Sequence, residues 1–201
     1  MKLIVVTGGI GSGKSEVCRI MRESGLTAQY DADDRVKKLY HEDPLLLSSI
    51  EDVLGMRLRD EDGKFIPRLL AARIFNDASA LQEVERLVFP ALLKDFKAFV
   101  GSHIDEKYVI FESATILEKE FFNGFGDYTI LVDAPFDVRL GRAAARDGVE
   151  RDAVIKRMNN QRLMNLLSEG HTDPRIDFII LNNGSRDELE LKVKELLTEK
   201  L

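Results

Sequence analysis

The sequence predicts an α/β fold in which a parallel sheet is flanked by helices. Three observations support this fold class. Short apolar runs of strand length recur along the 201 residues, and helical patterns separate them. A glycine-rich segment, TGGIGSGKS, links the first run to the first helical pattern. The apolar runs also end in polar residues, as expected where the carboxyl ends of parallel strands meet at one edge.

The first strand and helix follow from their patterns. Residues 3–6 are apolar at every position, which is typical of a strand buried inside a parallel sheet. From Ser15 onward, apolar residues recur at helical spacing, and Gly25 is the predicted stop. These apolar positions are Val17, Cys18, Ile20 and Met21.

The remaining elements divide the chain into a core and an insertion. Further strands are predicted at residues 26–30, 108–111, 128–132 and 178–181. Ser185 and Glu188 form a capping box that opens the last helix. Residues 41–100 contain only helical patterns around a turn at Asp62-Gly63. We therefore expect a nucleotide-binding core at 1–40 and 101–201, with a helical substrate-binding insertion at 41–100.

Composition excludes several classes of protein. Hydrophobic content of 44% and charged content of 32% indicate a globular chain. The net charge of −6 argues against a nucleic-acid binder, which needs a basic face. No apolar run approaches membrane-spanning length, and no signal peptide precedes the first strand, so we expect a cytoplasmic protein without a membrane partner. The single cysteine, Cys18, is predicted to be a core residue.

The segment after the first strand carries the Gly8-x-x-x-x-Gly13-Lys14-Ser15 pattern of a phosphate-binding loop. Its glycines can adopt positive φ. Its backbone N–H groups and the N-terminus of the following helix both attract phosphate oxygens. Lys14 is expected to reach the β- and γ-phosphates, and the Ser15 hydroxyl to ligate Mg²⁺. The alternative is a glycine-rich turn with a chance lysine, but the strand–loop–helix context favours a nucleoside triphosphate site.

Three carboxylates, Asp31, Asp33 and Asp34, follow the second predicted strand. Ligands of open α/β sheets bind outside the carboxyl ends of the strands, so we expect these side chains to face the phosphate loop. A carboxylate there can accept the proton of an attacking hydroxyl or support the metal ion. The alternative is that Asp34, or Asp31 as well, only caps the following helix.

Residues 138–165 form a basic stretch in an acidic protein. Its seven cationic side chains are Arg139, Arg142, Arg146, Arg151, Lys156, Arg157 and Arg162. The first three share one helix face by their spacing, and Arg157 is expected to share a face of the next helix with Gln161. Such a helical pair, at residues 139–165, can form a lid that neutralises charge on the γ-phosphate and excludes water. The alternative is a solvated charged face.

The last predicted strand is followed by Asn182, Asn183 and Gly184. Asn-Gly is common in turns. An Asn side chain can also hydrogen-bond the edge of adenine. The spacing alone leaves both interpretations open.

The ordered segments TGGIGSGKS, DAD, DGKFIPRLLAARIF, FESATILE, VDAPFDVRLGRAAARD, RMNNQ and DFIILNNG resemble those of dephospho-coenzyme A kinases. The resemblance runs from Lys2 to about Arg186. It implies a P-loop kinase core with a helical substrate domain and a lid. It also implies transfer of the γ-phosphoryl group of ATP to the ribose 3′-hydroxyl of dephospho-CoA, the last step of coenzyme A synthesis, with ATP and Mg²⁺ as cofactors.

The resemblance implies roles for single residues. Asp33 resembles the general base of the family, with Asp31 close by, and Arg142 resembles the lid arginine on the transferring phosphate. Lys14 completes the catalytic set. The nucleotide-binding positions are Gly9, Ile10, Gly11, Ser12, Gly13, Lys14, Ser15, Glu16, Arg146 and Asn182. The positions near the acceptor are Asp31, Arg68, Glu118, Arg157 and Gln161.

The sequence departs from the family pattern at two positions. Glu16 stands where a threonine usually follows the loop serine, and Phe89-Pro90 replaces the common His-Pro. Metal binding should survive the first change because Ser15 is kept. The second change removes any polar contact that the histidine makes to the acceptor.

Two other functions share features of this sequence. Another P-loop kinase, acting on a nucleoside monophosphate or another small alcohol, would share the loop, the carboxylate and the lid arginines. A GTPase switch would carry a guanine-reading Asn-Lys-x-Asp motif, and the sequence has none. We expect small-molecule substrates and a monomer or weak homo-oligomer.

Overall fold

The computed structural model describes residues 1–25, 27–75 and 77–201. Within these ranges the chain forms two compact units. The first unit contains Met1–Asp31 and His103–Leu201, and the second contains Ala32–Ser102. None of the helices in the described ranges has both the length and the apolar character needed to cross a membrane.

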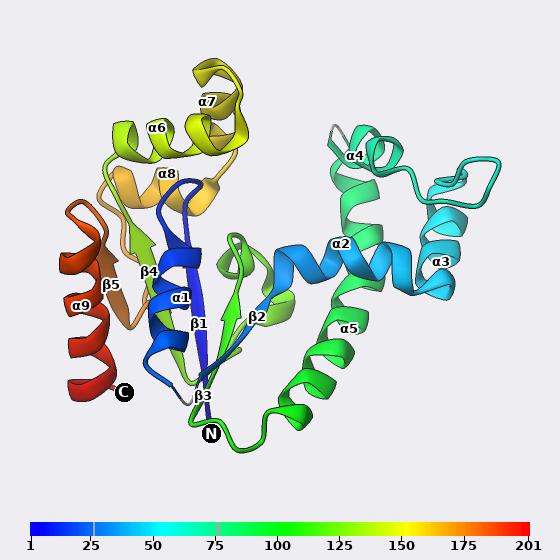
Figure 1. Ribbon diagram of the computed structural model, residues 1–201. Coiled ribbons are helices and arrows are strands. Elements are labelled where there is room, and N and C mark those ends of the chain that lie inside the picture. Colours follow the sequence, from blue (N-terminus) through cyan, green and yellow to red (C-terminus); the bar gives the residue numbers. More distant parts are fainter. Residues whose placement is uncertain (26, 76) are drawn as a thin grey trace. The chain divides into compact units, whose positions relative to one another are not determined.

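The first unit is built on a five-stranded sheet whose strands all run parallel, in the order β2-β3-β1-β4-β5 (Figure 1). The strands are β1 (Lys2–Gly8), β2 (Thr27–Asp31), β3 (Tyr108–Glu112), β4 (Tyr128–Asp133) and β5 (Phe178–Leu181). The predicted parallel sheet is therefore confirmed. Of the residues predicted to be in strands, Leu26 lies outside the described part of the chain.

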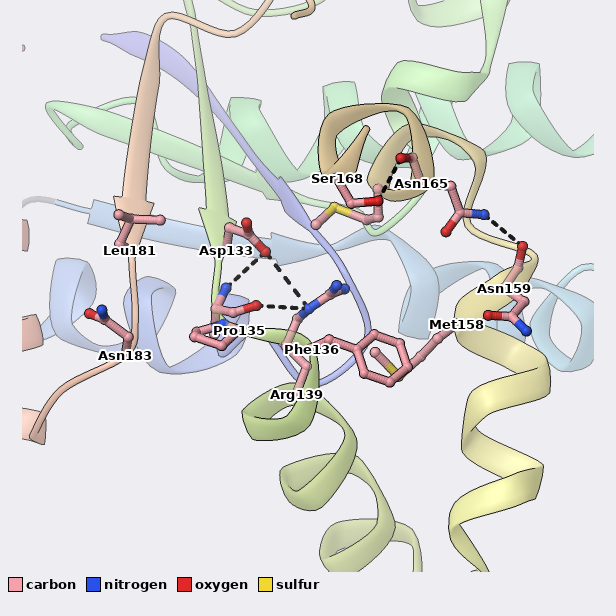
Figure 2. A pocket seen from close by; sticks show the side chains of 12 residues that line it. Asp133, Pro135, Phe136, Arg139, Met158, Asn159, Asn165, Ser168, Leu181 and Asn183 are labelled. Carbon is pink, nitrogen blue, oxygen red and sulfur yellow. Dashed lines mark hydrogen bonds and ion pairs between the residues drawn. The ribbon is translucent and has the colours of Figure 1, made fainter. Parts of the chain in front are cut away.

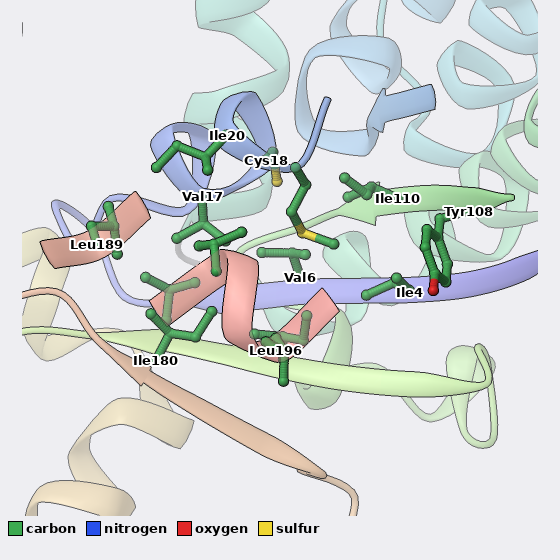
Figure 3. Close-up of a cluster of buried hydrophobic side chains, with 14 residues drawn as sticks. Ile4, Val6, Val17, Cys18, Ile20, Tyr108, Ile110, Ile180, Leu189 and Leu196 are labelled. Carbon is green, nitrogen blue, oxygen red and sulfur yellow. The ribbon is translucent and has the colours of Figure 1, made fainter. Parts of the chain in front are cut away.

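One face of the sheet packs against helices α1 (Lys14–Glu23) and α9 (Arg186–Glu199). Ile4 and Val6, which alternate along β1, are fully buried there among side chains of both helices (Figure 3). Complete burial of each such side chain is worth ~1.5–3 kcal/mol. Cys18 lies in the same cluster, as predicted, and burial raises the pKa of its thiol.

Three helices follow β4: α6 (Phe136–Asp147), α7 (Arg151–Asn159) and α8 (Arg162–Ser168). The prediction that Arg157 and Gln161 share one helix is wrong, because α7 ends before Gln161 and α8 begins after it. The side-chain amide of Asn165 donates to the main-chain carbonyl of Asn159 at 2.8 Å. This bond satisfies a carbonyl that the end of α7 leaves without a helical partner.

The second unit contains four helices in the described ranges: α2 (Ala32–Glu42), α3 (Pro44–Leu54), α4 (Pro67–Phe75) and α5 (Ala78–Ser102). The predicted turn at Asp62-Gly63 is confirmed, since Gly63 has a φ of 81° and Asp60 N donates to Lys64 O at 2.9 Å. Strand-like pairing is limited, in the described part of this unit, to one isolated bridge between Arg59 and Phe65. The expectation that helices dominate this region is borne out.

Candidate active site

The loop between β1 and α1 has the backbone that the sequence predicts. Gly8, Gly11 and Gly13 have φ values of 147°, 74° and 96°, a region that side-chain-bearing residues rarely adopt. Gly13 directly precedes the first residue of α1, so the helix N-terminus opens onto the loop. The loop therefore places main-chain N–H groups beside the positive end of a helix dipole, the arrangement that attracts phosphate.

Packing against the rest of the protein also requires these glycines. A Cβ at Gly8 would collide with the carbonyl oxygen of Val132 at the end of β4, and one at Gly11 with the carbonyl oxygen of Arg139 in α6. A Cβ at Gly13 would collide with the side-chain amide of Asn182. The sequence indicates only that glycine lets a ligand approach. The structure adds that Val132, Arg139 and Asn182 lie against these glycines and leave no room for a side chain.

Lys14 is the first residue of α1, and its side chain folds back over the loop. Its Nζ donates to the carbonyl oxygens of Gly8 at 2.9 Å and Gly9 at 3.3 Å. The ammonium group is therefore held against the loop. A bound phosphate would give it a fully charged acceptor in place of these two carbonyl oxygens. This placement suits the predicted contact of Lys14 with phosphate.

Ser15 shares a hydrogen bond with a buried carboxylate that the sequence analysis missed. Glu112, the last residue of β3, is 4% exposed. Its Oε1 accepts from the Ser15 hydroxyl at 2.7 Å, and its Oε2 accepts from Nε2 of Gln29 at 2.6 Å. A signal was available, because Glu112 directly follows the apolar run YVIF, just as Asp31 follows its own strand.

The donor set around Ser15 fits a magnesium ion. Mg²⁺ prefers oxygen ligands and is usually held by one or two protein groups together with phosphates and water. The Ser15 hydroxyl and the Glu112 carboxylate supply such oxygens within hydrogen-bonding distance of each other. Gln29 binds the other oxygen of this carboxylate and so holds the Glu112 side chain in its orientation toward Ser15.

The predicted carboxylates lie at the junction of strand and helix. Asp31 ends β2 and pairs in register with Glu112 of β3, so the two carboxylates end neighbouring strands at the same level. Asp33 and Asp34 lie within the first turn of α2, which begins at Ala32, and Asp34 is ion-paired with Lys38 at 2.7 Å. Asp31 belongs to the first unit and Asp33 to the second.

The lid arginines contact different partners. Arg142 Nη1 donates to the main-chain oxygen of Asn182 at 3.0 Å. Arg146 and Arg157 both bind the carboxylate of Asp147, through contacts of 2.7 Å and 2.6 Å. These two guanidinium groups hold the pKa of Asp147 well below its usual range, Arg146 contributing most. Asp147 thus joins two of the predicted ligand-binding arginines across α6 and α7.

Asn182 and Gln161 are both buried, at 7% and 8% exposure, and both bind the phosphate loop. The Asn182 side-chain amide donates to Ser12 O at 2.8 Å. Gln161 Oε1 accepts from the main-chain N–H of Ile10 at 2.8 Å. These polar groups therefore hold the loop itself, which the sequence pattern did not indicate.

Three predicted positions lie away from this network. Glu16 pairs with Arg19 and with Arg186, and these arginines lower the pKa of its carboxyl group, Arg19 contributing most. Glu118 accepts a hydrogen bond from the N–H of Leu163 at 2.9 Å, near the start of α8. Arg68 is exposed in the first turn of α4, in the second unit.

The arrangement in the first unit can bind a polyphosphate and a divalent cation. The loop supplies N–H donors and Lys14, while Ser15 and Glu112 supply oxygen ligands. Arg142 and Arg146 supply charge from α6. These are the parts that phosphoryl transfer needs around its donor, since catalysis there depends on positioning and charge neutralisation.

Sequence comparisons relate the chain to dephospho-CoA kinases. The protein-family model described as dephospho-CoA kinase matches residues 2–188. The chain is 36% identical over 173 residues to a dephospho-CoA kinase of Porphyromonas gingivalis, covering 86% of this chain and 84% of the relative. It is 34% identical over 199 residues to one of Chlorobaculum tepidum, covering 96% and 92%.

Solved structures share the fold. A crystal structure of a Thermus thermophilus protein superposes with a TM-score of 0.81 at 27% identity, covering 100% of this chain and 98% of the other. A Campylobacter jejuni dephospho-CoA kinase gives 0.59 at 22% identity, covering 98% and 96%, and this likeness concerns the fold alone.

Proposed function

The chain belongs to the dephospho-CoA kinase family, and on that premise we propose that its phosphate loop and lid transfer the γ-phosphoryl group of ATP to the ribose 3′-hydroxyl of dephospho-CoA. The products are coenzyme A and ADP. The observation that carries the proposal is the loop itself, whose glycine backbone, Lys14 and Ser15–Glu112 pair form a donor site within the first unit.

In this proposal the triphosphate lies on main-chain N–H groups of the loop, while that of Ile10 stays bound to Gln161, and Lys14 lies on its β- and γ-phosphates. Ser15 and Glu112 would hold Mg²⁺, which would neutralise charge on the phosphate oxygens. Arg142 and Arg146 add positive charge where negative charge develops during transfer. Asn182 keeps the loop and Arg142 in place through its contacts with both.

The acceptor is activated by Asp33 in this proposal. As the ribose 3′-oxygen forms its bond to the γ-phosphorus, the bond from that phosphorus to the bridging oxygen of ADP breaks, and Asp33 takes the hydroxyl proton. Asp31 would support the ligands of the metal ion beside Glu112. Arg68, Glu118, Arg157 and Gln161 are assigned to the acceptor or its surroundings from the family resemblance.

The proposal is tested by measuring ADP release with a panel of acceptors. With ATP and Mg²⁺ present, dephospho-CoA should stimulate ADP release strongly. A dephospho-CoA analogue that lacks the 3′-hydroxyl should not. Strong stimulation by a nucleoside monophosphate or another small alcohol instead would assign the chain to a different kinase activity.

The base is tested by a pair of variants. Asp33→Asn removes a proton acceptor and keeps the shape of the side chain, so kcat should fall by roughly a hundredfold to ten-thousandfold, as expected for general-base catalysis. ATP binding should be unchanged. Asp31→Asn is the matched control, with a milder loss of kcat that depends on Mg²⁺ concentration. The reverse pattern would make Asp31 the base, and full activity of both variants would remove the base from this pair.

A further inference from the structure

The first unit contains a cavity that none of the proposed steps uses. It has a volume of about 590 Å³ and lies among the ends of β4 and β5 and the helices α6, α7 and α8 (Figure 2). Small-molecule sites usually have volumes of about 300–1,000 Å³, so the cavity has room for an organic ligand. Apolar side chains of Phe136, Met158, Met164 and Leu181 form part of its wall.

The cavity lies beside the phosphate loop and does not include it. None of its lining residues belongs to the loop, residues 8–16. Leu181 and Asn183 line it, while the side chain of Asn182 between them donates to Ser12 of the loop. The cavity nevertheless borders the loop, because Arg139 Nη1 and Met164 Cγ, both from lining residues, lie against the position that a Cβ of Gly9 would take.

The cavity wall carries two charged residues, Asp133 and Arg139, and Arg139 is 7% exposed. Its Nε donates to the main-chain oxygen of Ala134 at 2.9 Å and lies 3.7 Å from the Asp133 carboxylate. Across the parts of the chain that the structure describes, neither of its terminal nitrogens donates a hydrogen bond to a protein group. These terminal nitrogens are not fully buried, so their donors are available to an acceptor in the adjoining cavity.

We propose that this cavity binds a small organic monoanion, a carboxylate attached to an apolar body. A carboxylate matches the planar edge that the terminal nitrogens of Arg139 present. The nearby negative charge of Asp133 disfavours a dianion such as a phosphate monoester. The apolar body would lie against Phe136 and Met158, which face the same space (Figure 2).

The same arginine connects the cavity to the nucleotide site. Its Nη1 lies where a Cβ of Gly9 would be, and its main-chain oxygen lies where a Cβ of Gly11 would be. A ligand that draws the guanidinium toward the cavity therefore changes the packing over the loop and should shift its affinity for ATP. This second effect rests on the proposed function, whereas binding of the anion does not.

The binding test uses 4-phenylbutyrate as the probe and its neutral amide as the matched ligand, with calorimetry on the full chain without nucleotide. The carboxylate should bind at least about tenfold more tightly than the amide, as expected for charge-assisted hydrogen bonds. Arg139→Met should remove this difference. Arg151→Met, which deletes an exposed arginine of α7 outside the cavity, should keep it.

A second variant locates the probe. Met164→Trp fills the cavity and keeps Arg139, so it should abolish binding of both ligands. If Arg139→Met fails to fold, this variant alone tests whether the probe binds in the cavity. The proposal would be overturned by equal affinity for carboxylate and amide, or by a Met164→Trp variant that binds as the wild type does. Loss of binding in Lys14→Ala would also overturn it, because the probe would then lie in the phosphate loop. ATP affinity measured with and without the probe then tests the coupling separately, and an unchanged affinity would overturn that part alone.

Discussion

The phosphate loop and the lid hairpin are held in place by different kinds of contact. The loop is fixed by main-chain packing and by buried amides, as at Gly11 against Arg139 and at Ser12 against Asn182. The hairpin of α6 and α7 holds Arg146 and Arg157 through the carboxylate of Asp147, and both arginines have exposed side chains.

This difference indicates which part is ready for a nucleotide and which part must rearrange. Buried hydrogen bonds are costly to break without replacement. Exposed ion pairs contribute little, so arginines can exchange them for phosphate oxygens at small cost. The loop is therefore preorganised, and the hairpin of α6 and α7, the predicted lid, holds Arg146 and Arg157 in exchangeable pairs. Substitutions in the loop should accordingly have larger effects than substitutions in the lid.

The largest effect is expected from Lys14→Ala, which removes the cation held on the loop. Losing preorganised charge at a transition state typically costs about a hundredfold or more in rate, and kcat should fall by that amount while the fold is kept. Steady-state kinetics and circular dichroism measure the two quantities. Lys200→Ala, at an exposed position near the end of the chain, is the control. Near wild-type turnover in Lys14→Ala would remove the donor site from the loop.

The next effect concerns the packing of the loop. Gly11→Ala combines a strained positive φ with a collision against Arg139 O, and backbone strain alone costs about 1–3 kcal/mol. Gly148→Ala is the matched control, because Gly148 has a φ of 63° but nothing lies near its added Cβ. Denaturant unfolding and ATP titration should give a larger loss for Gly11→Ala in both stability and affinity. Equal losses would mean that the loop is not pressed against α6.

A smaller effect is expected where the lid meets the loop. Arg142→Lys keeps the charge but loses the planar fork, so kcat should fall by about tenfold, the value of one charge-assisted hydrogen bond. The KM for dephospho-CoA should change less than kcat. Arg22→Lys, at an exposed position on α1, is the control. A change in KM alone would assign Arg142 to ground-state binding.

The smallest effect is expected from Asp147→Asn. The pKa of this carboxyl group is lowered in the folded protein, so its stabilising effect is present at neutral pH and disappears as the pH falls through the folded pKa. Melting temperatures of the variant and the wild type should therefore differ slightly but constantly between pH 6 and pH 8. The KM for ATP should shift by a few fold at most, and a large loss of kcat would show that the pair with Asp147 is not exchangeable.

The sequence predicted most of the fold because strong local signals specify it. The apolar runs identified the strands, the glycine pattern identified the loop, and the capping box at Ser185 and Glu188 is present as predicted. What it missed depends on contacts between distant segments. The burial of Arg139 and the bond between Gln161 and Ile10 join residues far apart along the chain. Glu112 carried a local signal, but only its contact with Ser15 reveals its place in the site.

We propose that this site phosphorylates the ribose 3′-hydroxyl of dephospho-CoA. The most direct measurement is the ³¹P NMR spectrum of the product formed from ATP, Mg²⁺ and dephospho-CoA. We expect one new phosphomonoester, coupled to the proton on the 3′-carbon and equal in amount to the ADP formed. ADP without a phosphorylated product, or a phosphate on any other position, would contradict it.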